Sequence, residues 1–193
     1  MSVPAKKLLT ISDFIKFPQN SRAELIDGEI IHKALPSGRH ADIQLQIGSC
    51  IRTAFHKKKK PNEPSGWWIA SEVSIYYSKL ERILTADLAG WLRSRVSEKP
   101  ISYPIYERPD WVCEVSISTL KKDTTVVFET LQTQGVPYYW IVNEASEQLM
   151  VYELINDRYS LIQSLFREDG SVRIKPFDAV EINMGVIFGD EID

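Results

Sequence analysis

Apolar residues recur at two different spacings along this chain, and each spacing predicts a different kind of element. Helical spacing is clearest after position 40, where one helical face would carry Ile43, Ile47, Ile51, Ala54 and Phe55. We therefore predict a helix that begins near His40 and ends at the four lysines 57–60. A shorter helix is predicted over 10–17, capped by Ser12 and ended by Pro18.

Short apolar runs and alternating patterns predict strands in the rest of the chain. A β-hairpin is predicted over 24–31, because Asp27-Gly28 is a strong type I′ turn signal between two short strands. Further strands are predicted over 67–77, 83–91, 111–116, 138–142, 148–154 and 159–163. A helix predicted over 120–134 separates the third of these strands from the fourth, and such a crossover implies a mixed sheet. The predicted fold is a single α/β domain over 1–193, with a mixed central β-sheet flanked by helices and a C-terminal β-meander.

Composition and charge narrow the classes of function. The 193 residues carry a net charge of −3, so no global basic field indicates a nucleic-acid partner, although local patches are compatible with one. The two cysteines, Cys50 and Cys113, lack metal-ligand spacing and are expected to be reduced, buried thiols. No apolar run approaches the roughly 18 residues that span a bilayer, and residues 1–7 lack the apolar core of a signal peptide. We therefore expect a cytoplasmic protein with no membrane partner.

Two acidic residues, Asp87 and Glu114, are the strongest candidates for chemistry. Each lies among apolar residues of a predicted strand, and 27 positions separate them (114 − 87). If these strands pair, the two carboxylates converge, and nearby carboxylates repel each other unless a cation neutralises them. Oxygen ligands favour Mg²⁺ or Mn²⁺, and such an ion can activate water for attack on a phosphodiester. The alternative is structural: Asp87 marks a strand end and Glu114 pairs with an arginine.

Asp110 is a less suitable partner for Glu114, because the two residues lie on the same predicted strand. Four residues of extended chain place their Cα atoms about 13 Å apart, at roughly 3.3 Å per residue. We expect Asp110 to begin the strand instead.

Six short motifs follow one another in a defined order: 24–29 (ELIDGE), His40, 66–69 (GWWI), 87–91 (DLAGW), 109–115 (PDWVCEV) and 135–142 (GVPYYWIV). In this order they resemble the Uma-type restriction endonuclease family, within the PD-(D/E)XK nuclease superfamily, over residues 8–163. The resemblance implies a restriction-endonuclease-like core and divalent-metal cleavage of DNA. It also implies that Asp87 and Glu114 are metal ligands and that Glu24 is a further acidic residue of the site. His40 matches a family histidine, although a lone histidine at a helix start is often a cap or packing residue.

The chain departs from the family pattern at a lysine. The superfamily has a lysine two residues after the glutamate, where this chain has Ser116, and the Uma-type family has it on the following helix, where this chain has Val127. Such a lysine orients the attacking water and offsets phosphate charge, and losing it costs around 10²–10³-fold in rate. Lys121 and Lys122 are candidate substitutes; alternatively they are exposed charges that open the helix. With Leu131, Val127 would form an apolar pair on a helix face that has become core.

Two functions are consistent with these residues. The first is a Mg²⁺- or Mn²⁺-dependent DNA endonuclease with Asp87, Glu114 and Glu24 as catalytic residues and Lys121 or Lys122 supplying the missing charge. Candidate substrate contacts are His40, Lys57 and Lys58. Alternatively, the lysines lie at the C-terminal end of the predicted helix, where positive charge interacts favourably with the helix macrodipole. The second function is a catalytically inactive nuclease-fold protein that binds nucleic acid or a protein partner. A further hypothesis is a structural homodimer built on exposed edge strands and the aromatic C-terminal hairpins.

Overall fold

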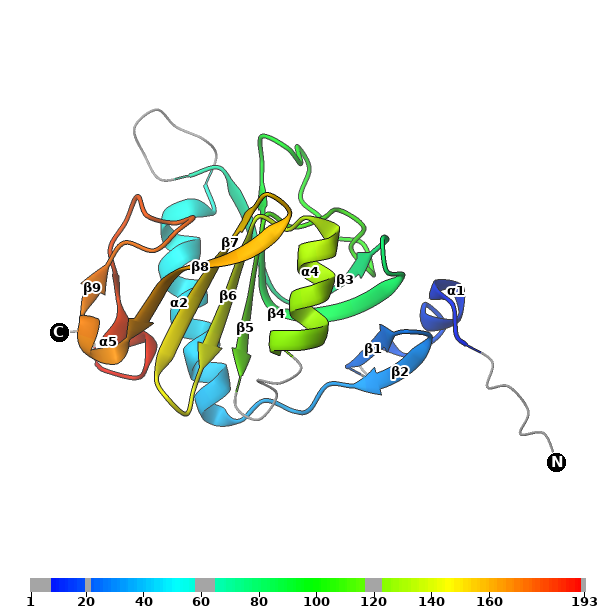
Figure 1. Cartoon of the computed structure of the whole chain (residues 1–193), viewed down its shortest axis with the longest axis horizontal. Coiled ribbons are helices and arrows are strands. Elements are labelled where there is room, and N and C mark those ends of the chain that lie inside the picture. The colour runs from blue at the N-terminus through cyan, green and yellow to red at the C-terminus, as the bar shows by residue number, and fades with distance from the viewer. Residues whose placement is uncertain (1–7, 20–21, 58–64, 117–122, 192–193) are drawn as a thin grey trace.

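The computed structural model describes residues 8–19, 22–57, 65–116 and 123–191, and it has helices on both faces of one large β-sheet (Figure 1). Within these residues the sheet contains β1 (Ala23–Ile26), β2 (Glu29–His32), β3 (Trp67–Tyr77), β4 (Arg82–Leu92), β5 (Trp111–Ser116), β6 (Tyr138–Asn143), β7 (Gln148–Ile155) and β8 (Arg158–Phe166). The helices are α1 (Ile11–Phe14), α2 (Gly38–Phe55), α4 (Phe128–Gln134) and α5 (Met184–Ile187). Shorter elements are the π-helical turn η2 (Asp123–Val127), the 3₁₀ turn η3 (Arg167–Asp169) and a two-stranded sheet of β9 (Ser171–Val172) and β10 (Ile182–Asn183).

Helix α2 is the helix predicted near His40, and its apolar face is buried as expected. Ser37 caps its first turn, because the Ser37 hydroxyl accepts a hydrogen bond from the His40 backbone N–H at 3.0 Å. The helix therefore begins at Gly38, two residues before the predicted start, and it ends at Phe55, before the lysines.

Helix α1 is shorter than predicted, and the prediction that Ser12 caps it was wrong. The cap is Thr10, whose hydroxyl accepts a hydrogen bond from the Asp13 backbone N–H at 3.3 Å. The Asp13 carboxylate accepts the Thr10 backbone N–H in return at 3.1 Å. This reciprocal capping box fixes the start of the helix at Ile11.

The central sheet is mixed, as predicted. Its strand order is β2-β1-β4-β5-β6-β7-β8, and β3 pairs with the other edge of β4. Strands β5 and β6 are parallel, and η2 and α4 lie between them in the chain. The hairpin of β1 and β2 turns at Asp27 and Gly28, whose φ angles of 51° and 78° fit the predicted type I′ turn. Strands β6, β7 and β8 form the predicted C-terminal meander.

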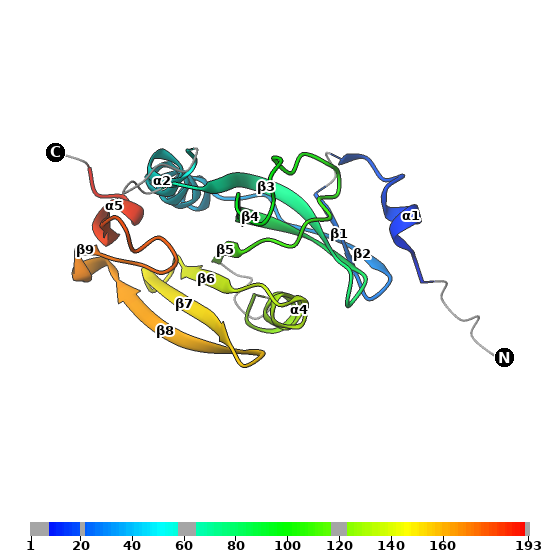
Figure 2. The ribbon, with the colours of Figure 1, turned by 90° about the horizontal axis from the view of Figure 1, so that it is seen from above.

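Two apolar clusters cover the two faces of this sheet (Figure 2). The first lies under α2 and α5 and includes Trp111 and Trp140. The second lies under α4 and includes Val127 and Leu131, so this helix face belongs to the core. The expectation that Val127 and Leu131 pack as an apolar pair in the core is thereby confirmed.

Strand β4 forks the sheet, and this fork positions the candidate site. One edge of β4 pairs with β3 along nearly its whole length. The other edge pairs with β1 at Ile83 and with β5 at Leu88–Gly90. Residues 84–87 lie between these two partners, so their outward backbone groups face side chains instead of another described strand. Polar side chains from several elements therefore converge at this point.

The end of the described chain contains short elements that were not predicted. After β8, the chain turns at η3 and at Gly170, which has a φ of 67°. Strands β9 and β10 and helix α5 span only two to four residues each, too few for a periodic pattern. Both cysteines are free, with Cys113 buried and Cys50 half-buried. Among the described residues, none of the helices has the length and apolar character needed to cross a bilayer.

Candidate active site

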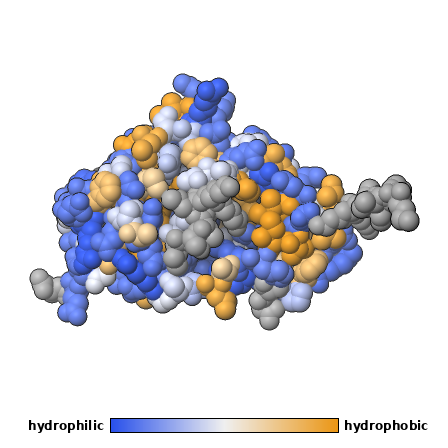
Figure 3. All heavy atoms as spheres, turned by 60° about the horizontal axis from the view of Figure 1, so that its bottom comes forward, coloured by the Kyte–Doolittle hydropathy of each residue, from blue (hydrophilic) through white to orange (hydrophobic). Residues whose placement is uncertain are grey.

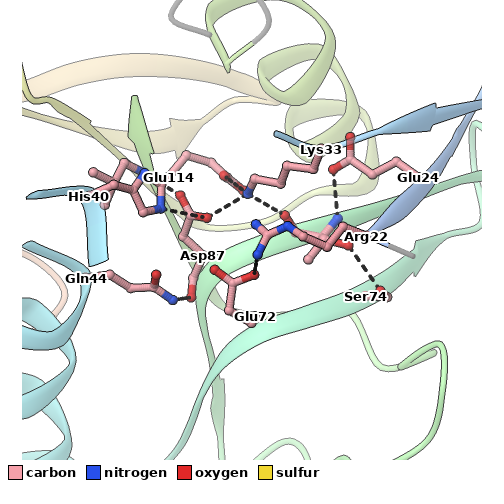
Figure 4. A network of polar contacts seen from close by, with 11 residues as sticks. Arg22, Glu24, Lys33, His40, Gln44, Glu72, Ser74, Asp87 and Glu114 are labelled. Carbon is pink, nitrogen blue, oxygen red and sulfur yellow. Dashed lines mark hydrogen bonds and ion pairs between the residues drawn. The ribbon is translucent and has the colours of Figure 1, made fainter. Parts of the chain in front are cut away.

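Side chains from three elements satisfy the backbone of β4 in the fork (Figure 4). Glu24 Oε1 on β1 accepts the Thr85 backbone N–H at 3.0 Å. Lys33 Nζ, just after β2, donates to the Thr85 carbonyl at 2.9 Å. Gln44 Nε2 on α2 donates to the Asp87 carbonyl at 2.8 Å. At the fork, backbone groups of β4 are therefore hydrogen-bonded to polar side chains of other elements.

Asp87 and Glu114 converge on the ammonium group of Lys33. Lys33 Nζ lies 2.7 Å from Asp87 Oδ1 and 3.0 Å from Glu114 Oε2 (Figure 4). The convergence follows from the antiparallel pairing of β4 and β5, in which Leu88 lies opposite Cys113. The expectation that these strands pair and bring the carboxylates together is confirmed. In the structural alternative Glu114 pairs with an arginine; the structure shows that it pairs with Lys33.

Burial and charge act against each other in this cluster. Burial alone would lower the pKa of Lys33, but the negative charges of Glu114 and Asp87 hold that pKa well above its ordinary value. Burial alone would raise the pKa of Asp87, but the contact with His40 and the charge of Lys33 hold it below its ordinary value. Asp87 Oδ2 also accepts the Val115 backbone N–H at 2.8 Å. At neutral pH the site therefore contains a charged lysine and an ionised aspartate.

His40 points its imidazole into the same cluster from the first turn of α2. Its residue is only 6% exposed, and Nε2 lies 3.4 Å from Asp87 Oδ1. Among the residues that the structure describes, Nε2 finds no hydrogen-bond partner. The capping role considered for His40 belongs to Ser37, and His40 contributes only its backbone N–H to that cap. The side chain therefore belongs to the site.

Glu24 enters the fork from β1 and contacts the backbone of β4. Its carboxylate is 1% exposed and binds the Thr85 backbone N–H. This contact fixes the hairpin against β4, where the single β1–β4 register pair joins Leu25 to Ile83. The described contacts of Glu24 thus support a positioning role.

The remaining sequence candidates lie away from the fork or outside the described residues. Lys57 is exposed just beyond α2. Lys58, Lys121 and Lys122 fall outside the described residues, so their predicted roles stay predictions. Asp110 is 2% exposed and binds Arg95 Nε at 2.8 Å and the Leu92 backbone N–H at 2.7 Å, which is consistent with the expected role at the strand start.

Sequence reasoning missed Lys33 and Glu72. Lys33 follows a hairpin in the sequence and carries no local motif; its backbone N–H donates to the Arg22 carbonyl at 2.9 Å, which continues the hairpin. Glu72 lies in the alternating pattern of β3, opposite Asp87 in a register that pairs Ser71 with Leu88. Its φ of 51° is unusual for a residue other than glycine, and no sequence signal predicts it.

The residues of the fork fit a divalent metal ion. Ligand atoms of His40, Glu72 and Asp87 all lie within 4.8 Å of one another. Carboxylate oxygens and a neutral imidazole nitrogen are common ligands of divalent metals. The buried His40 Nε2, which has no hydrogen-bond partner within the described part of the chain, is a further sign that a ligand belongs here.

Comparison with known proteins agrees with this architecture. The sequence model of a family described as "Uma2: Putative restriction endonuclease" matches residues 11–185, which extends past the resemblance noted over 8–163. A solved structure described as a "putative nuclease belonging to DUF820" from Anabaena variabilis superposes with a TM-score of 0.73 and 20% sequence identity. The match covers 93% of this chain and 97% of that chain, and it shows the shared fold. A search of curated proteins found no match.

Proposed function

Since this chain belongs to the Uma2 family of restriction-endonuclease-like proteins, we propose that it is a divalent-metal-dependent DNA endonuclease that hydrolyses phosphodiester bonds. The observation that carries the proposal is the convergence of Asp87, Glu114 and Lys33 at the fork of the sheet. Two carboxylates and a fixed cation at one point provide the charges that phosphodiester hydrolysis requires.

The fork would hold the metal, with Asp87 as the central ligand and His40 beside it. When bound, Mg²⁺ or Mn²⁺ would lower the pKa of a coordinated water and offset the charge of the phosphate. The Val115 backbone N–H and the Gln44 amide fix the orientation of Asp87 from two sides. The aspartate is therefore preorganised for its ligand.

Lys33 supplies the positive charge that the sequence lacks at position 127. Because its pKa is raised, the ammonium stays protonated and cannot act as a general base. It can offset negative charge on a phosphate oxygen and orient an attacking water by hydrogen bonding. Lys121 and Lys122 remain candidates for the same positive charge. Variants of these two lysines and of Lys33, made separately, would show which residue supplies it.

The second candidate function is a nuclease-fold protein without catalytic activity. It is favoured by one observation: Lys33 already neutralises Asp87 and Glu114, so the buried carboxylates are satisfied without a metal. Such a protein would bind nucleic acid or a protein partner on the same scaffold. It would bind DNA or a partner but cleave no phosphodiester bond with any metal.

Cleavage of supercoiled plasmid DNA tests the proposed function. We expect the full chain to nick the plasmid in Mg²⁺ or Mn²⁺, to stop in chelator, and to lose activity on Asp87→Asn. Glu98→Gln removes an exposed carboxylate in a loop and serves as the matched control. Nicking that persists in Asp87→Asn at the control rate would contradict the proposed site, and absence of nicking by the wild type would favour the inactive alternative.

Substrate contacts and assembly are further parts of the proposal. His40, which was predicted as a substrate contact, is buried and is proposed above as a metal ligand, so we propose that Lys57 and Lys58 contact the DNA and that two copies form a homodimer. Apolar side chains gather at the end of the surface that carries α1 and the first hairpin (Figure 3), where Leu8 and Ile31 are exposed. Light scattering after size-exclusion chromatography would measure the mass; a monomer at all concentrations would exclude the dimer.

A further inference from the structure

We propose that Glu72 is a metal ligand and that the metal lies between His40, Glu72 and Asp87. This inference rests on the proposed metal dependence and gives it a specific ligand set. It also predicts that Mn²⁺ binds more tightly than Mg²⁺ and that Arg22 competes with the metal for Glu72.

The first step in the argument is the placement of Glu72. It lies directly opposite Asp87, because the β3–β4 register pairs Ser71 with Leu88 and Val73 with Ala86. The ladder is interrupted at this residue, whose φ is 51°. Its carboxylate lies beside Asp87 and His40, with one ligand atom of each residue within 4.8 Å of the others (Figure 4).

The second step is the imidazole of His40. The side chain is buried, its Nε2 is directed at Asp87 Oδ1 from 3.4 Å, and no hydrogen-bond partner of Nε2 is found among the described residues. A buried nitrogen normally has a partner, because leaving it unsatisfied costs about 1–3 kcal/mol. A metal bound between His40, Glu72 and Asp87 would supply that partner.

The third step is the distribution of charge around Asp87. Lys33 Nζ lies 3.0 Å from Glu114 Oε2 and 2.7 Å from Asp87 Oδ1. Glu72 instead pairs with Arg22, whose Nη1 lies 3.2 Å from Glu72 Oε2. The hairpin thus brings two cations to the fork, Lys33 to Asp87 and Glu114 and Arg22 to Glu72, and the backbones of Lys33 and Arg22 are joined by a hydrogen bond.

The ion pair of Arg22 with Glu72 is weaker than the ion pair of Lys33 with Glu114. The Glu72 side chain is 34% exposed, whereas that of Glu114 is 6% exposed, so the Arg22 contact is better screened by water than the Lys33 contact. A divalent ion can therefore replace Arg22 at Glu72 more easily than it can replace Lys33 at Glu114. The released guanidinium would remain at the rim of the site, where it could contact a phosphate.

The ligand types decide which metal is preferred. Two carboxylates and one imidazole offer two oxygens and one nitrogen. Mg²⁺ favours all-oxygen ligands, whereas imidazole is a better ligand for transition metals. The affinity for Mn²⁺ should accordingly exceed that for Mg²⁺.

Mn²⁺ binding to the full chain without DNA tests this ligand set. Electron paramagnetic resonance of free Mn²⁺ gives the dissociation constant, and pulsed measurements of bound Mn²⁺ report coupling to an imidazole nitrogen. We expect Glu72→Gln to weaken binding at least about tenfold. Arg22→Gln should tighten it, because a competing cation is removed. Glu98→Gln should leave it unchanged.

The nitrogen coupling gives an independent result from the same sample. It should be present in the wild type and absent in His40→Gln. Wild-type affinity in Glu72→Gln, weaker binding in Arg22→Gln, or no nitrogen coupling would overturn the inference. If Glu114→Gln abolished Mn²⁺ binding and Glu72→Gln retained it, the metal would be assigned to Asp87 and Glu114 instead. Because no DNA is present, binding as expected without plasmid cleavage would contradict the proposed function alone.

Discussion

Lys33 Nζ lies 2.7 Å from Asp87 Oδ1, although 54 positions separate the two residues in the chain. The contact connects the end of the N-terminal hairpin to the middle of the central sheet. It supplies a fixed positive charge at the candidate active site, at a place where neither β5 nor α4 has a described lysine. This relationship leads to specific expectations for stability and activity.

Lys33→Met should make the stability of the protein depend on metal. Without Lys33, the buried carboxylates of Asp87 and Glu114 lose their common partner, which typically costs about 3–5 kcal/mol. A divalent ion at 100 times its dissociation constant would restore about 2.7 kcal/mol. Thermal unfolding with and without Mn²⁺ measures both effects. A variant that is as stable as wild type without metal would show that Lys33 does not hold the carboxylates.

Moving the lysine to the helix should partly restore function. Val127 is 3% exposed and packs in the cluster that contains Ala86, next to Asp87. In wild type, Val127→Lys should destabilise the fold, because it buries a charge among apolar side chains. In Lys33→Met, the same substitution should raise plasmid nicking above that of the single variant. A double variant that folds, as judged by circular dichroism, but gains no activity would count against this exchange.

Asp110→Asn should reduce stability without removing the active site. The Asp110 carboxylate accepts hydrogen bonds from Arg95 and from the Leu92 backbone N–H, and its side chain is 3% exposed. Losing the charge of this buried, hydrogen-bonded carboxylate should cost about 2–4 kcal/mol in urea unfolding. Plasmid nicking at a temperature where the variant is folded should stay near wild type. Loss of Mn²⁺ binding in this variant would instead place Asp110 in the metal site.

Stability should fall in mild acid because of His56. Burial and the nearby positive charges of Arg52 and Arg93 lower the pKa of His56 to about 4. The unfolded pKa is about 6.5, so the unfolded state binds more protons as the pH falls. The contribution of neutral His56 to the free energy of unfolding is complete above about pH 6.5 and is lost as the pH falls through about 4.

A His56→Gln variant isolates this titration. Nδ1 of His56 accepts the Ile69 backbone N–H at 2.9 Å, and the glutamine carbonyl can accept the same bond. Urea unfolding at pH 7 and pH 5 should show a smaller difference for the variant than for wild type. Equal pH dependence in both proteins would exclude His56 as a source of the acid sensitivity.

The parts of the fold that depend on local pattern could be predicted from the sequence. Helix α2 was predictable because Ile43, Ile47 and Ile51 repeat at helical spacing. Strand β5 matches its predicted bounds, because Trp111–Ser116 is a continuous apolar run with one charge. The convergence of Asp87 and Glu114 followed once these strands were assumed to pair.

The partners of Asp87 could not be predicted in the same way. Lys33 reaches the site because a single register pair, Leu25 with Ile83, docks the hairpin on β4. That docking is a tertiary contact, and no regular spacing of residues along the chain indicates it. Glu72 faces the site because its backbone adopts a left-handed conformation, which an alternating strand pattern does not indicate.

The initial rate of plasmid nicking in Mn²⁺ tests the central claim most directly, in wild type, in Lys33→Met and in a Lys121→Ala/Lys122→Ala variant. If Lys33 supplies the catalytic charge, wild type and the double variant should nick the plasmid at similar rates, and Lys33→Met should be slower by about 10²–10³-fold. Lys33→Met nicking at the wild-type rate, or no nicking by the wild type under any divalent metal, would contradict it.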